Sequence, residues 1–280
     1  MPAALAALRD DRVDAERVPV ASFAQAPTQE LIARLRDAGV ITIASVGARR
    51  HAEKVAAWGI DAVIATGGEG GGHIGAVPTS LLIPQVAAAV DIPVIAAGGF
   101  FDGRGLVAAL AYGAAGIAMG TRFLLTRDSP VAEEVKRVYL AAGLGGTVVT
   151  TRVDGVPHRV LRTTMVDRLE RAGRLTGLLR AAGNAAAFRG MSGLSWRELI
   201  RQGRAMRRDT ELTWGQVLMA ANTPVLLRAA MVDGRPDLGL MSSGQVAGLI
   251  DDLPSCQELI QAIMTEAERR LDRLAAVRTA

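Results

Sequence analysis

The sequence has few of the features that mark secreted, membrane-spanning or nucleic-acid-binding proteins. Cys256 is its only cysteine, so the chain can form neither an intrachain disulfide nor a multi-cysteine metal site. A reducing, cytoplasmic setting is therefore the default expectation. No apolar run reaches the length of about 18 residues that a membrane-spanning helix requires, because Asp91 and Pro93 interrupt the longest candidate. Lysine and arginine form no continuous run with interleaved aromatic residues, so we expect neither a membrane nor a nucleic acid as partner.

The residues that are present favour a large α/β protein. Half of the 280 residues are hydrophobic, which is enough to bury a sizeable core, and the formal net charge of +4 is modest for this size. Short apolar runs alternate with segments of helical spacing about every 20 to 30 residues, as in parallel α/β folds. The expected strands are Val18–Phe23, Val40–Val46, Asp61–Thr66, Ile92–Ala97 and Ala115–Met119, and the expected helices between them are Thr28–Ala38, Ala48–Trp58, Ser80–Val90 and Gly103–Tyr112.

Glycine-rich turns follow the last three of these strands. They are Gly67–Gly75, Gly98–Gly99 and Gly120–Thr121. Consecutive N–H groups in such turns can cradle an anion, because glycine has no Cβ to keep a ligand away. Three such turns at the carboxyl end of one sheet favour a phosphate-bearing ligand, with the Thr121 hydroxyl as a further donor. The alternative is that the glycines serve only to turn the chain.

His73 lies inside the first of these turns. An imidazole can take or give a proton near neutral pH, and a loop at the mouth of the sheet would let it reach a bound substrate. A loop histidine taken alone is more often a solvated or structural residue, so the neighbouring motifs decide its interpretation.

Those motifs resemble the signature of the nitronate monooxygenase family, formerly called 2-nitropropane dioxygenases. They are Glu69–Gly75, Ala96–Phe100 and Met119–Phe123. The same trio is similar to the related flavin-dependent enoyl-thioester reductases and NADH:quinone reductases, which are FMN-binding TIM-barrel proteins. The resemblance implies that FMN is the cofactor and that Gly71, Gly72, Gly98, Gly99, Met119, Gly120 and Thr121 bind it.

The resemblance also assigns roles outside the phosphate turns. It implies that His73 faces the flavin as catalytic base or substrate-orienting group. The segment Met241–Ile250 resembles the family's Gly-Gln-x-x-Gly segment, which makes Gln245 a hydrogen-bonding partner near the cofactor. A water-facing glutamine is the alternative for that position.

Aligned by motif, the five expected strands resemble strands four to eight of a (β/α)8 TIM barrel that lacks its first three strands. An open sheet of this kind would leave both edge strands unpaired, which is an aggregation hazard. We considered a gene start placed too late, one half of a split protein and a degenerate remnant, and favour the first. The open sheet argues against the chain as given folding into an active enzyme by itself.

The sequence divides into three expected parts. Residues 1–128 form the partial FMN-binding barrel, residues 129–240 a mostly helical cap, and residues 241–280 the return to the barrel with a closing helix. Within the cap, Asp154-Gly155 between two β-prone runs predicts a hairpin near residues 147–162 with a two-residue turn. Four arginines of an expected Trp196–Arg208 helix share one face, which suits either a solvated surface or the phosphates of coenzyme A. His51 and His158 are read as surface residues.

Three functions follow as hypotheses. The first is an FMN-dependent monooxygenase that oxidises alkyl nitronates with oxygen, with His73 as base. The second is an NAD(P)H- and FMN-dependent reductase of an unsaturated acyl-CoA, because Trp214–Pro224 and Leu249–Pro254 resemble actinobacterial members tied to steroid-ring breakdown. The third is an inactive truncated remnant. A small-molecule substrate, a nitronate or an acyl-CoA, is expected in the first two cases. No metal site is expected, and a homodimer is an open alternative for the assembly.

Overall fold

The computed structural model describes residues 18–24, 27–171 and 222–279, together with seven single residues between 189 and 204. Ala3–Asp14, whose sequence predicts the end of a helix, lies outside the described residues. The expected Trp196–Arg208 helix and the segment Trp214–Pro224 lie largely outside them.

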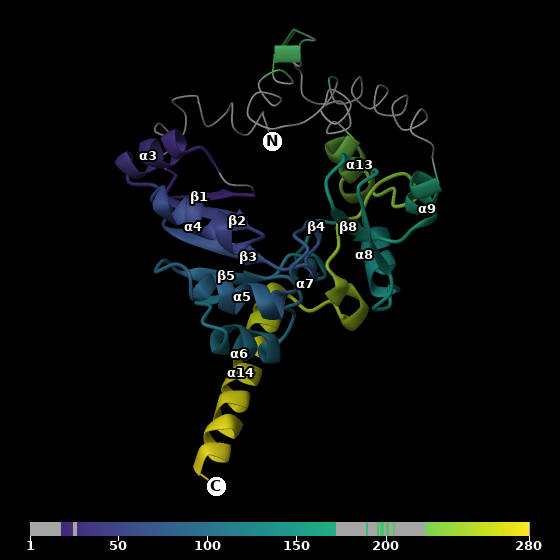
Figure 1. The fold of residues 1–280 in the computed structure, drawn as a ribbon. Helices are drawn as coiled ribbons and strands as arrows, with labels where there is room; N and C mark the ends of the chain where they lie inside the picture. The colour runs from purple at the N-terminus through teal and green to yellow at the C-terminus, as the bar shows by residue number, and fades with distance from the viewer. Residues whose placement is uncertain are drawn as a thin grey trace.

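A parallel sheet of five strands forms one half of the molecule, in the order β1-β2-β3-β5-β6 (Figure 1). The strands are β1 (Val20–Phe23), β2 (Ile41–Val46), β3 (Ala62–Thr66), β5 (Val94–Ala97) and β6 (Gly116–Ala118). The helices between them are α3 (Gln29–Asp37), α4 (Arg49–Ala57), α5 (Thr79–Ala87) and α6 (Gly103–Ala111). The expected β/α alternation is confirmed, and its strands pair in chain order, as consecutive units of a (β/α)8 barrel do.

The apolar runs form strands because helices cover the sheet. Ala44, Val63 and Ala96 are fully buried and belong to one core with Leu82 of α5. Asp102 caps α6, since its carboxylate accepts a hydrogen bond from the Gly105 N–H at 2.9 Å.

The sheet is open at both edges among the described residues. β1 pairs only with β2, and β6 pairs only with β5. Val20 on β1 and Ile41 at the start of β2 have exposed fractions of 42% and 51%. The expectation of an open sheet with unpaired edge strands is therefore confirmed.

A second half of the molecule gathers around a small antiparallel sheet of order β4-β8-β7. Its strands are β4 (Gly72–His73), β7 (Thr147–Thr150) and β8 (His158–Leu161). The helices α8 (Glu133–Leu140), α9 (Thr164–Arg171) and α13 (Asn222–Met231) lie around it (Figure 1). Because β4 belongs to the first glycine-rich turn, that turn joins the two halves.

The hairpin near residues 147–162 is confirmed, but its expected two-residue turn is wrong. Thr150 pairs with His158, so residues 151–157 form the loop between β7 and β8. Gly155 does adopt a left-handed φ of 86°. Asp154 points inward, where its carboxylate is held by contacts with distant residues, and the loop is longer for that reason.

The chain then returns to the parallel sheet. A 3-10 turn, η1 (Gln245–Leu249), leads to the helix α14 (Cys256–Thr279), which packs on α6 and extends away from the rest of the molecule (Figure 1). None of the helices in the described part of the chain is long and apolar enough to cross a membrane.

Candidate functional site

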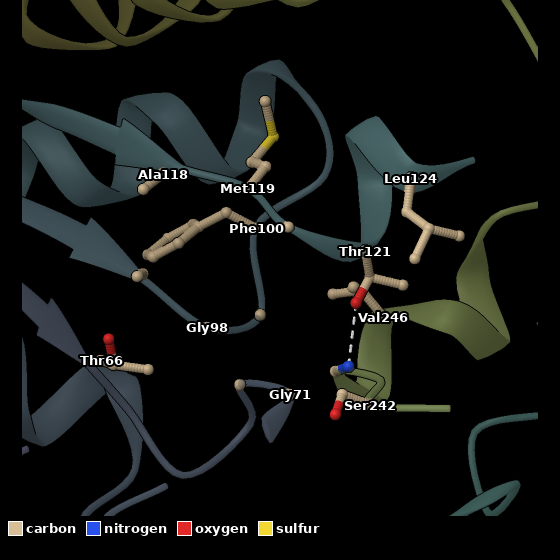
Figure 2. Close-up of a pocket in the computed structure, with 15 residues that line it drawn as sticks. Thr66, Gly71, Gly98, Phe100, Ala118, Met119, Thr121, Leu124, Ser242 and Val246 are labelled. Carbon is tan, nitrogen blue, oxygen red and sulfur yellow. Dashed lines mark hydrogen bonds between the residues drawn. The ribbon is translucent and has the colours of Figure 1, made fainter. Parts of the chain in front are cut away.

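A cavity of about 540 Å³ opens at the carboxyl ends of β3, β5 and β6 (Figure 2). Binding pockets for small molecules and cofactors have volumes of roughly 300 to 1,000 Å³. Its wall is made by the three glycine-rich turns on one side and by residues 242–246, which run into η1, on the other. The lining residues are Thr66, Gly70, Gly71, Ala97, Gly98, Gly99, Phe100, Ala118, Met119, Gly120, Thr121, Leu124, Ser242, Gly244 and Val246.

Six residues predicted to bind the cofactor line this cavity, namely Gly71, Gly98, Gly99, Met119, Gly120 and Thr121. Gly72, His73 and Gln245 do not line it. Gly72 and His73 follow Gly71 directly in β4, and Gln245 stands between the lining residues Gly244 and Val246. The backbone N–H of Gln245 donates to the Glu69 carbonyl at 3.0 Å, which ties the return segment to the first turn.

The turn after β5 has a backbone that suits anion binding. Gly98 and Gly99 have φ angles of 92° and 83°, in the left-handed region that favours glycine. Gly120 also lines the cavity, and a Cβ built on it would meet no atom within 4 Å, so the space beside it is open.

The Thr121 hydroxyl is engaged as a hydrogen-bond acceptor. Its Oγ1 accepts a hydrogen bond from the Gly244 N–H at 2.9 Å (Figure 2). The hydroxyl hydrogen is left to donate, and Thr121 lines the cavity. Thr121 therefore joins the β6 turn to the return segment and still has the donor that the sequence predicted.

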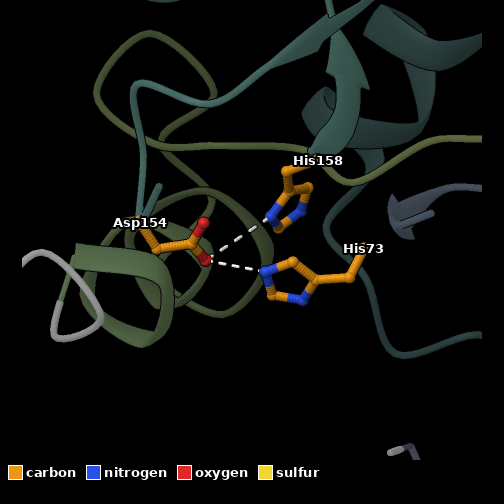
Figure 3. Close-up of side chains that lie close together, drawn as sticks. All are labelled: His73, Asp154 and His158. Carbon is orange, nitrogen blue, oxygen red and sulfur yellow. Dashed lines mark hydrogen bonds and ion pairs between the residues drawn. The ribbon is translucent and has the colours of Figure 1, made fainter. Parts of the chain in front are cut away.

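Beside the cavity, His73 belongs to a cluster with Asp154 and His158 (Figure 3). His73 Nε2 lies 2.7 Å from Asp154 Oδ2, and the two imidazole centroids lie 4.6 Å apart. The exposed fractions of the side chains are 39% for His73, 6% for Asp154 and 2% for His158. One histidine of the cluster is thus accessible, and it rests on a buried carboxylate.

The buried carboxyl of Asp154 is ionised. Burial by itself would raise its pKa, but donors on His158, His73 and Thr223 face it and hold the pKa well below its usual range. His158 Nδ1 is 4.0 Å from Oδ2, beyond hydrogen-bond reach, so its effect is that of an N–H dipole directed at the charge.

Comparison with known proteins identifies the family. The family model described as Nitronate monooxygenase matches residues 6–266. The chain belongs to the nitronate monooxygenase family.

Two relatives match almost the whole chain. Both are named (3aS,4S,5R,7aS)-5-hydroxy-7a-methyl-1-oxo-octahydro-1H-indene-4-carboxyl-CoA dehydrogenase. The protein from Mycobacterium tuberculosis is 62% identical over 273 residues, 95% of this chain and 77% of that protein. The protein from Rhodococcus jostii is 58% identical over 270 residues, 96% of this chain and 76% of that protein. Among solved structures, FabK from Thermotoga maritima matches with a TM-score of 0.73 at 32% identity, over 95% of this chain and 73% of that one.

The cavity fits the phosphate of the flavin that the resemblance to this family implies. The left-handed Gly98-Gly99 turn, the open space beside Gly120 and the Thr121 hydroxyl face one cavity. Backbone N–H groups and a hydroxyl, without a carboxylate among the lining residues, are the donor set that a phosphate requires.

Sequence reasoning missed several residues that fix the turns around this cavity. Arg159 Nη2 donates to the Gly68 carbonyl at 2.9 Å, and Glu69 Oε2 accepts from the Thr79 N–H at 2.8 Å. Both contacts fix the first glycine-rich turn. The first contact joins residues 91 positions apart and the second joins residues 10 positions apart, and neither follows from a local sequence pattern.

His158 was also misjudged, because it is buried and not a surface residue. Its Nε2 lies 2.8 Å from Ser242 Oγ, and the Ser242 carbonyl accepts a hydrogen bond from the Tyr139 hydroxyl at 2.7 Å. One signal was present in the sequence. Strand alternation puts His158 on the same side as Val160, a residue type that favours the interior.

Proposed function

We propose that this chain is a flavin-dependent acyl-CoA dehydrogenase that acts on the thioester of a bicyclic, indane-type carboxylic acid. The support is the pair of relatives that carry such a name and match at least 95% of the chain. Chemically, this is the oxidative direction of the acyl-CoA reductase hypothesis. We therefore favour this activity over the oxidation of alkyl nitronates.

The observation that carries the chemistry is the pairing of His73 with Asp154. Nε2 of His73 is engaged at 2.7 Å, while no hydrogen bond to its Nδ1 occurs within the described part of the chain. An imidazole that donates from one nitrogen to a carboxylate presents a lone pair on the other, as a general base requires. In the proposed reaction, Nδ1 takes the proton from the carbon next to the thioester carbonyl.

The remaining half of the reaction concerns the adjacent carbon. The carbon next to the thioester carbonyl loses the proton, and the following carbon loses a hydride equivalent. A carbon–carbon double bond forms between these two carbons. FMN, when bound, supplies the acceptor for this hydride. Gly98, Gly99, Gly120 and Thr121 would hold its phosphate, and Met119 would lie alongside. In this oxidative direction the reduced flavin must pass the two electrons on to an oxidant, whereas the NAD(P)H of the reductase hypothesis would supply electrons for the reverse reaction.

The test is an anaerobic mixing experiment with the purified yellow protein. The probe is the CoA thioester named for the two relatives, and bleaching of the flavin absorbance is measured. We expect bleaching with the thioester and an ultraviolet signal from the new conjugated double bond. With an alkyl nitronate in air, we expect no nitrite above the level of free FMN.

Three outcomes would contradict the proposal. Nitrite release from the nitronate without bleaching by the thioester would make the protein a nitronate monooxygenase. Bleaching with free acid as readily as with the thioester would remove coenzyme A from the substrate. A protein that binds no FMN at all would leave the inactive remnant as the remaining hypothesis.

A further inference from the structure

We infer that Asp154 is a positioning residue that fixes the tautomer of His73. Its carboxylate holds the proton of the neutral imidazole on Nε2 and so leaves Nδ1 as the proton acceptor. The inference rests on the proposed role of His73, but the tautomer itself can be measured without any reaction.

Strand pairing brings the participants together. β4 and β8 are antiparallel, and their register puts His73 directly opposite His158. Cross-strand neighbours of this kind have side chains on the same face. The loop after β7 then folds back over this face and places Asp154 against both rings (Figure 3).

The two carboxylate oxygens of Asp154 serve different purposes. Oδ1 accepts a hydrogen bond from the Val156 N–H at 3.2 Å, two residues along, which shapes the loop as an Asx turn. Oδ2 lies 2.7 Å from His73 Nε2 and 2.7 Å from the Thr223 hydroxyl. A carboxylate accepts only, so both partners of Oδ2 must be donors. The proton of neutral His73 is therefore on Nε2.

His158 supports the charge of Asp154 from the other side. Its Nδ1 is buried, has no hydrogen-bond partner within the described part of the chain, and lies 4.0 Å from Oδ2. A lone pair there would face a negative charge, so the favourable tautomer carries its proton on Nδ1. His158 Nε2 then accepts from the Ser242 hydroxyl, 2.8 Å away, and Ser242 also lines the cavity.

The same three side chains also satisfy the spacing of a metal site, since their ligand atoms lie within 4.8 Å of one another. The hydrogen bonds favour the positioning role. Oδ2 already accepts from Thr223, and the His73 contact has the length of an ordinary hydrogen bond. A metal ion would have to replace both, and it would occupy the Nε2 that fixes the tautomer.

The first experiment measures the tautomer in the wild-type protein. The chain has three histidines, so ¹⁵N-histidine labelling gives three imidazole spin systems, and His51→Ala and His73→Ala assign them. We expect the His73 signals of a neutral ring protonated at Nε2. A ring protonated at Nδ1 would overturn the inference, and so would a joint shift of His73 and His158 with one equivalent of Zn²⁺.

The second experiment is Asp154→Asn. The amide oxygen can keep the turn hydrogen bond to Val156, which places the amide nitrogen against His73 Nε2. Two donors cannot face each other, so His73 must move its proton to Nδ1. We expect this tautomer change in the spectrum, retention of FMN, and a kcat lower by on the order of 10²- to 10⁴-fold with little change in KM.

Asp167→Asn is the matched control. It makes the same chemical change in Asp167 of α9, which forms an exposed ion pair with Arg162. It should change neither the spectrum nor kcat. An Asp154→Asn protein with wild-type kcat, or with the His73 tautomer unchanged, would overturn the positioning role. A failure of the proposed function alone gives a different result. The wild-type protein would then show the expected tautomer but would not react with the thioester.

Discussion

At the residue scale, Gly120 offers the cleanest test of the phosphate site. A Cβ there meets no atom within 4 Å, so a side chain costs the folded protein little by itself. Gly98 and Gly99 differ, because their positive φ makes any substitution strained whether or not a ligand binds. We expect Gly120→Val to fold like the wild type and to purify without FMN, measured by absorbance near 450 nm (roughly, for a bound flavin).

The control is Gly116→Ala on β6, where a Cβ also meets no atom within 4 Å but the residue does not line the cavity. This variant should stay yellow. A yellow Gly120→Val protein would remove Gly120 from the phosphate site.

Also at the residue scale, Asp154 predicts a dependence of stability on pH. Its folded-state pKa is depressed, so the carboxylate contributes stability that is fully present above its unfolded pKa of about 4. That contribution is lost progressively as the pH falls below about 4. We expect the free energy of unfolding to fall less steeply in Asp154→Asn than in the wild type over this acid range, measured by denaturant titration at several pH values. Parallel curves would contradict an ionised buried Asp154.

At the element scale, the packing of α14 on α6 depends on Gly103. A Cβ at this position would lie 2.5 Å from the Ile263 carbonyl oxygen and 2.7 Å from the Ala267 nitrogen. Helix propensity predicts that Gly103→Ala stabilises α6 by up to about 1 kcal/mol. The backbone clash should outweigh this gain, since overpacking typically costs about 1 to 3 kcal/mol.

We therefore expect a lower melting temperature for Gly103→Ala, followed by circular dichroism. Gly145→Ala, where a Cβ meets no atom within 4 Å, is the control and should melt like the wild type. An unchanged or higher melting temperature for Gly103→Ala would mean that α14 can move away from α6 at little cost.

The elements also show what the sequence could predict. The strands of the parallel sheet were predictable, because a strand that is buried on both faces has a continuous apolar run in its own sequence. The hairpin loop was not. Asp154-Gly155 carries the local signal of a two-residue turn, but Asp154 Oδ2 binds His73, 81 residues away, and that contact lengthens the loop.

The candidate site divides in the same way. Eight residues were predicted to bind the cofactor from turn composition and family resemblance, and six of them line one cavity, while Gly72 and Gln245 do not. Asp154 and His158 were missed, because their burial depends on the pairing of β4 with β8. Two segments separated by more than 80 residues meet there, and the sequence of one does not indicate that the other lies beside it.

At the scale of the whole molecule, the cavity lies between two hydrophobic cores. One core fills the space around the parallel sheet and includes Val63 and Ala96, and another includes Tyr139, Met241 and Val246. The turns after β5 and β6 belong to the first, while Ser242, Gly244 and Val246 reach the cavity from the second. A ligand in the cavity therefore contacts both halves of the molecule and should stabilise them together.

This arrangement predicts that FMN raises one shared melting transition. At a free FMN concentration about 100 times its dissociation constant, binding adds about 2.7 kcal/mol, which for a chain of this size corresponds to roughly 5 to 10 °C. Calorimetry of the protein with and without FMN measures the shift, and Gly120→Val should show none. If two transitions appear and FMN moves only one, the ligand contacts one half alone, and the return segment from Ser242 to Val246 is not part of its site.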